Sequence, residues 1–317
     1  MAREPWLVVG TGAMAGFFAA HLAAAGEPVV MLGTWRAALD ALQAHGLRWI
    51  DLEGRERVYP VRVLDPPHPL RARGALVLVK AWQTERAARQ LAALVPASTP
   101  ILTLQNGLGP QDVLREHLGP ARVTVGVTTY AARVRAAGVV QATGQGTVDL
   151  AREPQGTFWA EILRRAGLEV RVHEDVRSLI WGKLAINAAI NPLTALLDVP
   201  NGALLEDPAA RLFMARAARE VERVAAAQGI RLPFDDAPRV AYEVARRTAQ
   251  NSSSMREDLR RGAPTEIDAI CGAVARIGRA VGQPAPLNEA LWQMVREAVA
   301  QHRAPRAVPS PLAPTRR

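Results

Sequence analysis

The sequence feature that most constrains the fold is a pair of glycines directly after the first apolar run. Residues 6–9 read WLVV, Gly10-Thr11-Gly12 follow, and a helix-like segment, FFAAHLAAAG, begins at Phe17. A strand, a glycine turn and a helix in this order are typical of a dinucleotide-binding α/β fold. A purely structural turn is the alternative, but a second apolar run at 29–32 completes the expected strand–helix–strand unit.

Each residue type in this turn has a physical reason. Gly10 permits the tight turn, Gly12 lets a pyrophosphate approach the backbone, and the following helix offers free N–H groups and a positive dipole end. Ala15 stands where a third glycine is usual, with Gly16 directly after it. We therefore expect this turn to bind the cofactor through Gly10, Thr11, Gly12, Ala13, Met14 and Ala15.

The residues after the second apolar run favour NADP over NAD. An acidic residue there would bind the adenosine ribose, but the sequence reads Leu32-Gly33-Thr34-Trp35-Arg36. A hydroxyl from Thr34 and a guanidinium from Arg36 would suit a ribose 2′-phosphate, and Trp35 or Arg36 could stack on adenine. The alternative for Thr34 is that it only caps the next helix. We expect NADPH as cofactor, with Thr34 and Arg36 among its contacts.

Lysine is almost absent from the chain. Of 39 basic residues, only Lys80 and Lys183 are lysines. Arginine stays protonated and cannot act as a general acid, whereas lysine can when burial or a neighbouring charge moves its pKa toward the working pH. Chance survival is the alternative, but both lysines lie in apolar surroundings, which indicates that an ammonium is needed there.

The segment Trp181 to Leu197 carries a polar stripe on otherwise apolar faces of a helix that the periodicity predicts over residues 176–190. Asn187 and Asn191 follow Lys183 at four-residue steps, which keep the three side chains within roughly 80° of helix surface. Buried polar groups need partners, either a small polar ligand or hydrogen bonds between helices. Because Asn191 precedes a proline, which tends to end or kink a helix, its direction is less well defined than that of Asn187.

Two further apolar runs, expected as parallel strands, end in polar residues. Residues 75–79 lead into Lys80, and residues 101–104 lead into a segment that contains Asn106-Gly107. In an open parallel sheet, ligands bind at the carboxyl edge of the strands. The sequence therefore places Lys80 and Asn106 at this edge, although an Asn-Gly pair alone is a plain turn in most proteins.

The hydrophobic periodicity divides the chain into two domains and a tail. Residues 1–174 alternate strand-like and helix-like segments, which predicts an α/β dinucleotide-binding domain. Residues 175–303 are helical in pattern throughout, and the proline- and arginine-rich residues 304–317 are expected to be disordered.

Several element boundaries follow from the same pattern. Residues 58–63 are expected as one strand, and segments within 123–150 as antiparallel strands at the edge of the sheet. Residues 265–281 are expected as one helix, in which Thr265 and Asp268 would form a capping box.

Composition narrows the class of protein. A single cysteine, Cys271, excludes an internal disulfide and a multi-cysteine zinc site, and the six histidines are scattered, so no metal site is expected. No apolar run reaches the roughly 20 residues of a membrane span and no secretory layout is present, which predicts a cytoplasmic protein.

The net charge of +9 suits anionic ligands, but the arginines do not cluster as on a nucleic-acid-binding surface. Apolar faces in the helical domain are compatible with a homodimer.

Three groups of segments together resemble the ketopantoate reductase (2-dehydropantoate 2-reductase) family. They are GTGAMA with VKAWQT and QNGLG, then WGKLAINAAINPLTALL, then NSSSMREDLRRGAPTEIDAICG. The resemblance spans nearly the whole chain and implies a Rossmann domain joined to a helical domain of the phosphogluconate dehydrogenase-like type. It also implies reduction of ketopantoate to pantoate with NADPH, on the route to pantothenate and coenzyme A.

The resemblance implies roles for individual residues. Lys183 falls on the catalytic lysine, the proton donor to the carbonyl oxygen, and Glu266 falls on the acid that supports it. Without the resemblance, Glu266 would be taken as a first-turn acid that favours a helix dipole. The substrate-binding positions are matched by Asn187, Asn191 and Ser254. The cofactor and substrate cleft is lined by Lys80 and Asn106, so Asn106 is expected to contact both. Trp35 stands where many members have arginine, with Arg36 beside it.

The chemistry agrees with these roles. Hydride addition to a 2-keto acid builds negative charge on the carbonyl oxygen, and a positioned ammonium both stabilises and protonates that oxygen. Two alternatives remain at this stage. The same fold could reduce a different 2-keto acid or related carbonyl compound, or the protein could bind NADPH without catalysis, with the polar stripe serving only packing.

Overall fold

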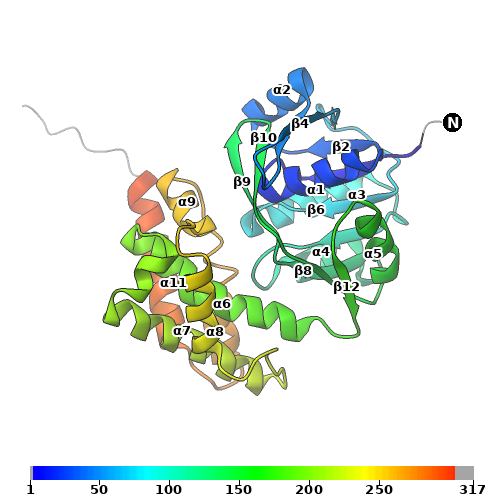
Figure 1. Cartoon of the computed structure of the whole chain (residues 1–317). Coiled ribbons are helices and arrows are strands. Elements are labelled where there is room, and N and C mark those ends of the chain that lie inside the picture. The colour runs from blue at the N-terminus through cyan, green and yellow to red at the C-terminus, as the bar shows by residue number, and fades with distance from the viewer. Residues whose placement is uncertain (1–2, 304–317) are drawn as a thin grey trace, which may run out of the picture.

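The computed structural model describes residues 3–303; the tail at 304–317, expected to be disordered, lies outside this range. The described strands run from β1 (Trp6–Val9) to β12 (Val170–His173), and the helices α6 (Arg177–Leu197) to α11 (Pro286–Arg303) follow them. Figure 1 shows a sheet-containing lobe and a helical lobe, with α6 running from the first into the second. Within residues 3–303, no helix combines the length and apolar character needed to cross a membrane.

The first lobe is built on an eight-stranded sheet in the order β12-β11-β8-β7-β6-β1-β2-β5. Its remaining strands are β2 (Val29–Leu32), β5 (Arg62–Val63), β6 (Gly74–Val77), β7 (Ile101–Thr103), β8 (Val123–Thr128) and β11 (Val148–Ala151). All neighbouring pairs are parallel except β8 and β11, which are antiparallel. Because β1 lies between β2 and β6, the chain changes direction across the sheet at β1, where a dinucleotide crevice forms in such folds.

Helices cover both faces of this sheet. On one face, α1 (Ala13–Ala24) and α5 (Gly156–Arg165) contribute Phe18 and Trp159 to a core that includes Trp6. On the other face, α3 (Thr84–Leu94) and α4 (Pro110–Leu118) contribute Leu91 and Leu114. Strands enclosed in this way are apolar along their whole length, which explains the continuous apolar runs in the sequence.

A second, four-stranded sheet in the order β4-β3-β10-β9 packs on α1. Its strands are β3 (Leu47–Ile50), β4 (Glu56–Tyr59), β9 (Ala131–Ala136) and β10 (Val139–Gly144). A Cβ atom on Gly16 would lie 2.5 Å from Cγ2 of Val140 in β10, so the glycine after Ala15 is needed for this close helix–sheet contact.

This sheet corrects two expectations about strands. The segments expected at the edge of one sheet are divided: β11 is antiparallel to β8 in the main sheet, whereas β10 pairs with β3 in the second. The single strand expected at 58–63 is interrupted at Pro60, and β4 and β5 belong to different sheets. Proline has no N–H to donate to a ladder, so it marks a strand boundary.

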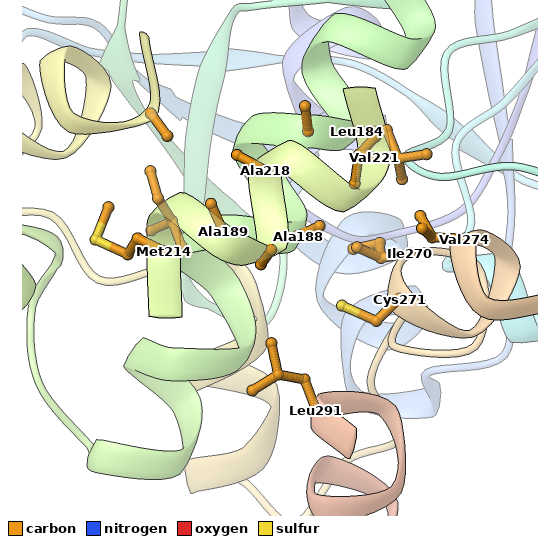
Figure 2. Packing of buried hydrophobic residues seen from close by; sticks show 14 of the residues in the cluster. Leu184, Ala188, Ala189, Met214, Ala218, Val221, Ile270, Cys271, Val274 and Leu291 are labelled. Carbon is orange, nitrogen blue, oxygen red and sulfur yellow. The ribbon is translucent and has the colours of Figure 1, made fainter. Parts of the chain in front are cut away.

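The helical lobe packs around α6. It contains η3 (Asn201–Leu205), α7 (Pro208–Ala227), α8 (Ala237–Arg247), α9 (Ser254–Arg260) and α10 (Cys271–Ala280). Figure 2 shows small α6 residues, Ala188 and Ala189, among larger side chains such as Met214 of α7. Cys271 is fully buried in the same cluster, and burial raises the pKa of its thiol, so it serves as a small apolar packing residue.

Two helix boundaries differ from the sequence pattern. Helix α6 continues through Pro192 to Leu197, because packing of its apolar faces on α7 overrides the local effect of the proline. Helix α10 begins at Cys271 rather than Thr265. The residues before it form turns, and Asp268 accepts a hydrogen bond from the Trp292 indole at 2.7 Å instead of capping a helix.

A buried carboxylate on α7 stabilises the N-terminus of α11. Glu220, 5% exposed, accepts hydrogen bonds from the backbone N–H groups of Leu287 at 3.0 Å and Asn288 at 2.9 Å. These N–H groups have no partner within their own helix, so the carboxylate replaces the missing acceptors.

We expect Glu220→Ala to lower the free energy of unfolding by about 2–4 kcal/mol, because it leaves buried donors unpaired. Glu222→Ala, two residues away on the same helix, removes only a surface ion pair with Arg219 and should cost about 1 kcal/mol or less. Urea denaturation of both variants measures the difference. Equal losses would show that Glu220 does not support α11.

Candidate active site

The glycine turn lies at the carboxyl end of β1, where the main sheet changes direction. Gly10 has a φ of +131°, which side chains rarely adopt, and Gly12 directly precedes α1. A Cβ atom built on Gly12 meets nothing within 4 Å, so the backbone there is open to a ligand. The first turn of α1 contains no acidic residue. These properties fit the pyrophosphate of a dinucleotide.

Glu266 joins the two lobes. It precedes α10 and is 5% exposed. Its Oε1 accepts a hydrogen bond from the Ala81 N–H at 3.1 Å, and its Oε2 accepts one from Nδ2 of Asn106 at 3.2 Å. The Lys80 ammonium lies 3.8 Å from the same Oε2. A single carboxylate of the helical lobe therefore contacts the segments that follow β6 and β7.

A glycine makes this approach of the two lobes possible. The N–H of Leu108 donates to the Ala269 carbonyl at 2.8 Å across the boundary. Gly107 has a φ of +82°, and a Cβ atom there would lie 2.4 Å from that carbonyl oxygen. The Asn106-Gly107 pair is therefore part of the contact between the lobes, rather than only a turn.

Lys80 is held by a second acid, Asp258 of α9. The Lys80 ammonium donates to Oδ2 of Asp258 at 2.6 Å, and Arg261 contacts the other oxygen at 3.0 Å. Burial disfavours the Lys80 ammonium, but the charges of Glu266 and Asp258 outweigh burial and raise the pKa of Lys80 above its usual value. For Asp258, burial is the largest effect and raises the pKa of its carboxyl.

Lys183 lies on α6, facing the sheet lobe. Its ammonium donates a hydrogen bond to the backbone carbonyl of Thr128, at the end of β8, at 2.7 Å. Burial lowers the pKa of Lys183 to about 8, and the negative charge of Glu266 acts in the opposite direction. An amine with this pKa can both hold and release a proton near neutral pH, as a general acid requires.

Lys183 and Asn187 line one pocket, together with residues of β7, β8, α4, α6 and the segment after β7. These are Thr103, Gln105, Gly107, Pro110, Gln111, Val125, Gly126, Val127, Ile180 and Leu184. Asn191 is 9% exposed and is not among the lining residues. Ser254 is exposed at the first position of α9, and its neighbour Ser253 caps that helix by accepting from the Arg256 N–H.

The structure thus brings together Lys80, Asn106 and Glu266 by direct contact, and Lys183 with Asn187 by a shared pocket. Asp258 was not predicted from the sequence, because it lies in the charged segment MREDLRR and resembles one acid of a solvated helix face.

Comparisons with known proteins agree over most of the chain. Residues 6–155 match the family model described as ketopantoate reductase PanE/ApbA, and residues 175–299 match the model of its C-terminal part. A 2-dehydropantoate 2-reductase from Halobacterium salinarum is 36% identical over 296 residues, which cover 92% of this chain and 97% of that protein. The corresponding protein of Archaeoglobus fulgidus is 34% identical over 294 residues, covering 91% of this chain and 96% of the relative.

Solved structures show the same arrangement of lobes. A PanE/ApbA family ketopantoate reductase from Ralstonia eutropha superposes with a TM-score of 0.86 at 30% identity, covering 94% of this chain and 99% of the other. D-mandelate dehydrogenase, solved with NADH and anilino(oxo)acetate, superposes with a TM-score of 0.88 at 24% identity over 94% of this chain and 99% of that one. At that identity the second likeness concerns the fold alone.

Proposed function

The chain belongs to the ketopantoate reductase family, and from this premise we propose that it reduces 2-dehydropantoate (ketopantoate) to pantoate with NADPH, in the biosynthesis of pantothenate and coenzyme A. The proposal rests on one observation. Lys183, whose ammonium has a pKa lowered to about 8, shares a pocket with Asn187 beside the nucleotide-binding sheet. Among the residues that line this pocket, Lys183 is the only one whose side chain can hold and release a proton near neutral pH, so it is the candidate to protonate a keto oxygen there.

In the proposed reaction, the glycine turn would hold NADPH, which when bound would supply the hydride for the keto carbon. Lys183 donates its proton to the carbonyl oxygen as negative charge develops on it. Glu266 holds Lys80 and Asn106 at the cleft and counteracts the effect of burial on Lys183. This combination keeps a proton available on Lys183 at neutral pH.

Substrate binding is assigned to amide and hydroxyl groups around this lysine. A 2-keto acid carries a carboxylate and a carbonyl that both accept hydrogen bonds. We propose that Asn187, which lines the pocket with Lys183, and Asn106, whose amide contacts Glu266, donate them, and we extend the same role to Asn191 and Ser254 through the family resemblance. Thr34 and Lys80 are proposed to contact the cofactor. Residues 1–174 would then form the NADP-binding domain and residues 175–303 the substrate and catalytic domain.

The decisive test is NADPH oxidation by the purified protein with ketopantoate, pyruvate and other 2-keto acids, each repeated with NADH. Ketopantoate should give the highest kcat/KM, with NADPH preferred. If ketopantoate were no better than pyruvate, the substrate assignment would fail, while the reductase activity would stand. Tight NADPH binding without turnover of any carbonyl compound would indicate a non-enzymatic binding protein.

Two expectations from the sequence extend this proposal. A single, buried cysteine is typical of a reducing compartment, so we place the protein in the cytoplasm. We also propose a homodimer, since α7 exposes adjacent large apolar side chains at Leu212 and Phe213. Light scattering of the purified protein measures its mass in solution, and a monomer at all concentrations would refute the dimer.

A further inference from the structure

We propose that Arg86, on α3, binds the 2′-phosphate of NADPH and is the residue that makes this protein prefer NADPH over NADH. The inference rests on the proposed function, because it concerns the cofactor of that reaction. Its central observation is a contact across the nucleotide crevice: Arg86 Nη2 donates a hydrogen bond to the hydroxyl of Thr34 at 3.2 Å.

The end of β2 is the place where the adenosine ribose is expected. Strand β2 lies beside β1 in the sheet, and a Cβ atom on Gly33 would lie 2.6 Å from Cγ2 of Thr11 in the glycine turn. Thr34 follows Gly33 directly and is exposed. A dinucleotide with its pyrophosphate on the glycine turn therefore extends its adenosine ribose toward Thr34.

Arg86 presents a free guanidinium at this place. It is exposed, and no carboxylate within residues 3–303 forms an ion pair with it. Arg89, one turn further along α3, instead pairs with Glu85. Arginine donates in a planar fork that matches phosphate, so an unpaired guanidinium beside a hydroxyl forms a suitable 2′-phosphate site.

Arg36, which the sequence predicts for this role, is engaged elsewhere. Its guanidinium forms ion pairs with both Asp40 and Asp65, and Nε donates to Asp40 at 2.8 Å. Two carboxylates beside a guanidinium repel a dianionic phosphate and occupy the donors that would bind it. Of the two arginines, Arg86 is therefore the one whose donors are available next to Thr34.

Nucleotide fragments test the inference without turnover. We would titrate the full chain with 2′,5′-ADP, which carries the 2′-phosphate, and with 5′-AMP, which lacks it, by calorimetry. Wild-type protein should bind 2′,5′-ADP more tightly. Arg86→Gln should weaken 2′,5′-ADP binding by about ten- to a hundredfold, the usual effect of losing a charged hydrogen bond, and leave 5′-AMP binding unchanged. Arg89→Gln is the matched control and should change neither.

Kinetics with both cofactors complete the test. Arg86→Gln should raise the KM for NADPH by a similar factor and leave kcat and the NADH parameters unchanged. Full retention of 2′,5′-ADP affinity in Arg86→Gln, or its loss in Arg36→Gln instead, would overturn the inference while ketopantoate reduction stands. If the wild-type chain bound neither fragment and oxidised neither NADPH nor NADH, both the inference and the proposed function would fail.

Discussion

Replacing Lys183 with arginine should lower kcat for ketopantoate reduction by about a hundredfold to ten-thousandfold, the range typical of losing a general acid. Arginine keeps the positive charge near the carbonyl of Thr128, so the developing oxyanion would still be stabilised electrostatically. It cannot release the proton that the reaction consumes, because its pKa stays far above neutral. Charge stabilisation and proton donation are thereby separated in one variant. Steady-state rates of NADPH oxidation measure the effect.

Two measurements distinguish loss of the general acid from loss of folded structure in this variant. The Lys183→Arg protein should unfold at nearly the wild-type temperature and bind NADPH with unchanged affinity. Arg177→Gln, at the exposed start of the same helix, serves as the control variant and should retain wild-type turnover. Substantial activity in Lys183→Arg would remove Lys183 as the acid.

The second large effect is expected for Glu266→Gln, which should lower kcat by about ten- to a hundredfold, as for lost hydrogen bonds to charged groups. The amide keeps a similar shape and can still accept from the Ala81 N–H. It loses the negative charge that faces Lys80 and that raises the pKa of Lys183. The variant therefore keeps the hydrogen bond between the lobes but loses the negative charge at this contact.

A pH profile distinguishes this electrostatic role from a structural one. Reduction requires protonated Lys183, so its rate should fall as the pH rises through the pKa of this lysine. Without the charge of Glu266, that pKa drops below its wild-type value of about 8, and the alkaline fall should begin at lower pH. Glu257→Gln, on the nearby helix α9, should leave the profile unchanged. An unshifted profile in Glu266→Gln would contradict the coupling between Glu266 and Lys183.

Features set by local physics were predictable from the sequence. The glycine turn can be identified from the sequence because the strand, the glycines and the helix N-terminus are adjacent in the chain. Lys183 and Asn187 share a pocket because four-residue spacing puts both on one side of a helix. Hydrophobic periodicity predicted the order of the lobes, and the family resemblance identified the fold of each, in agreement with the comparisons.

Features that depend on contacts between distant segments were not predictable. The carboxylate of Asp258 meets Lys80 across 178 positions of the sequence, and Arg86 meets Thr34 across 52. The residues that flank Asp258 and Arg86 in the sequence give no indication of these partners. Glu266 was expected in a helix, but its segment forms turns because its carboxylate and the Ala269 carbonyl are held by the sheet lobe.

The pairing of strands in the second sheet also depends on contacts between distant segments and was not predictable from the sequence. The strand β10 pairs in parallel with β3, which lies far earlier in the chain. Alternating patterns identify such strands, but they do not specify which sheet a strand joins when more than one edge is available. Gly16 carried the only local hint, since a glycine inside a helix often marks a close approach of another element.

The most direct measurement is the single-turnover rate of ketopantoate reduction by the wild-type protein from about pH 6 to about pH 10. If the Lys183 ammonium donates the proton, the rate should be constant at low pH and fall tenfold per pH unit above its pKa of about 8. A rate that stays constant across this whole pH range, as expected for a lysine with the ordinary pKa of 10.5, would contradict proton donation by this buried lysine.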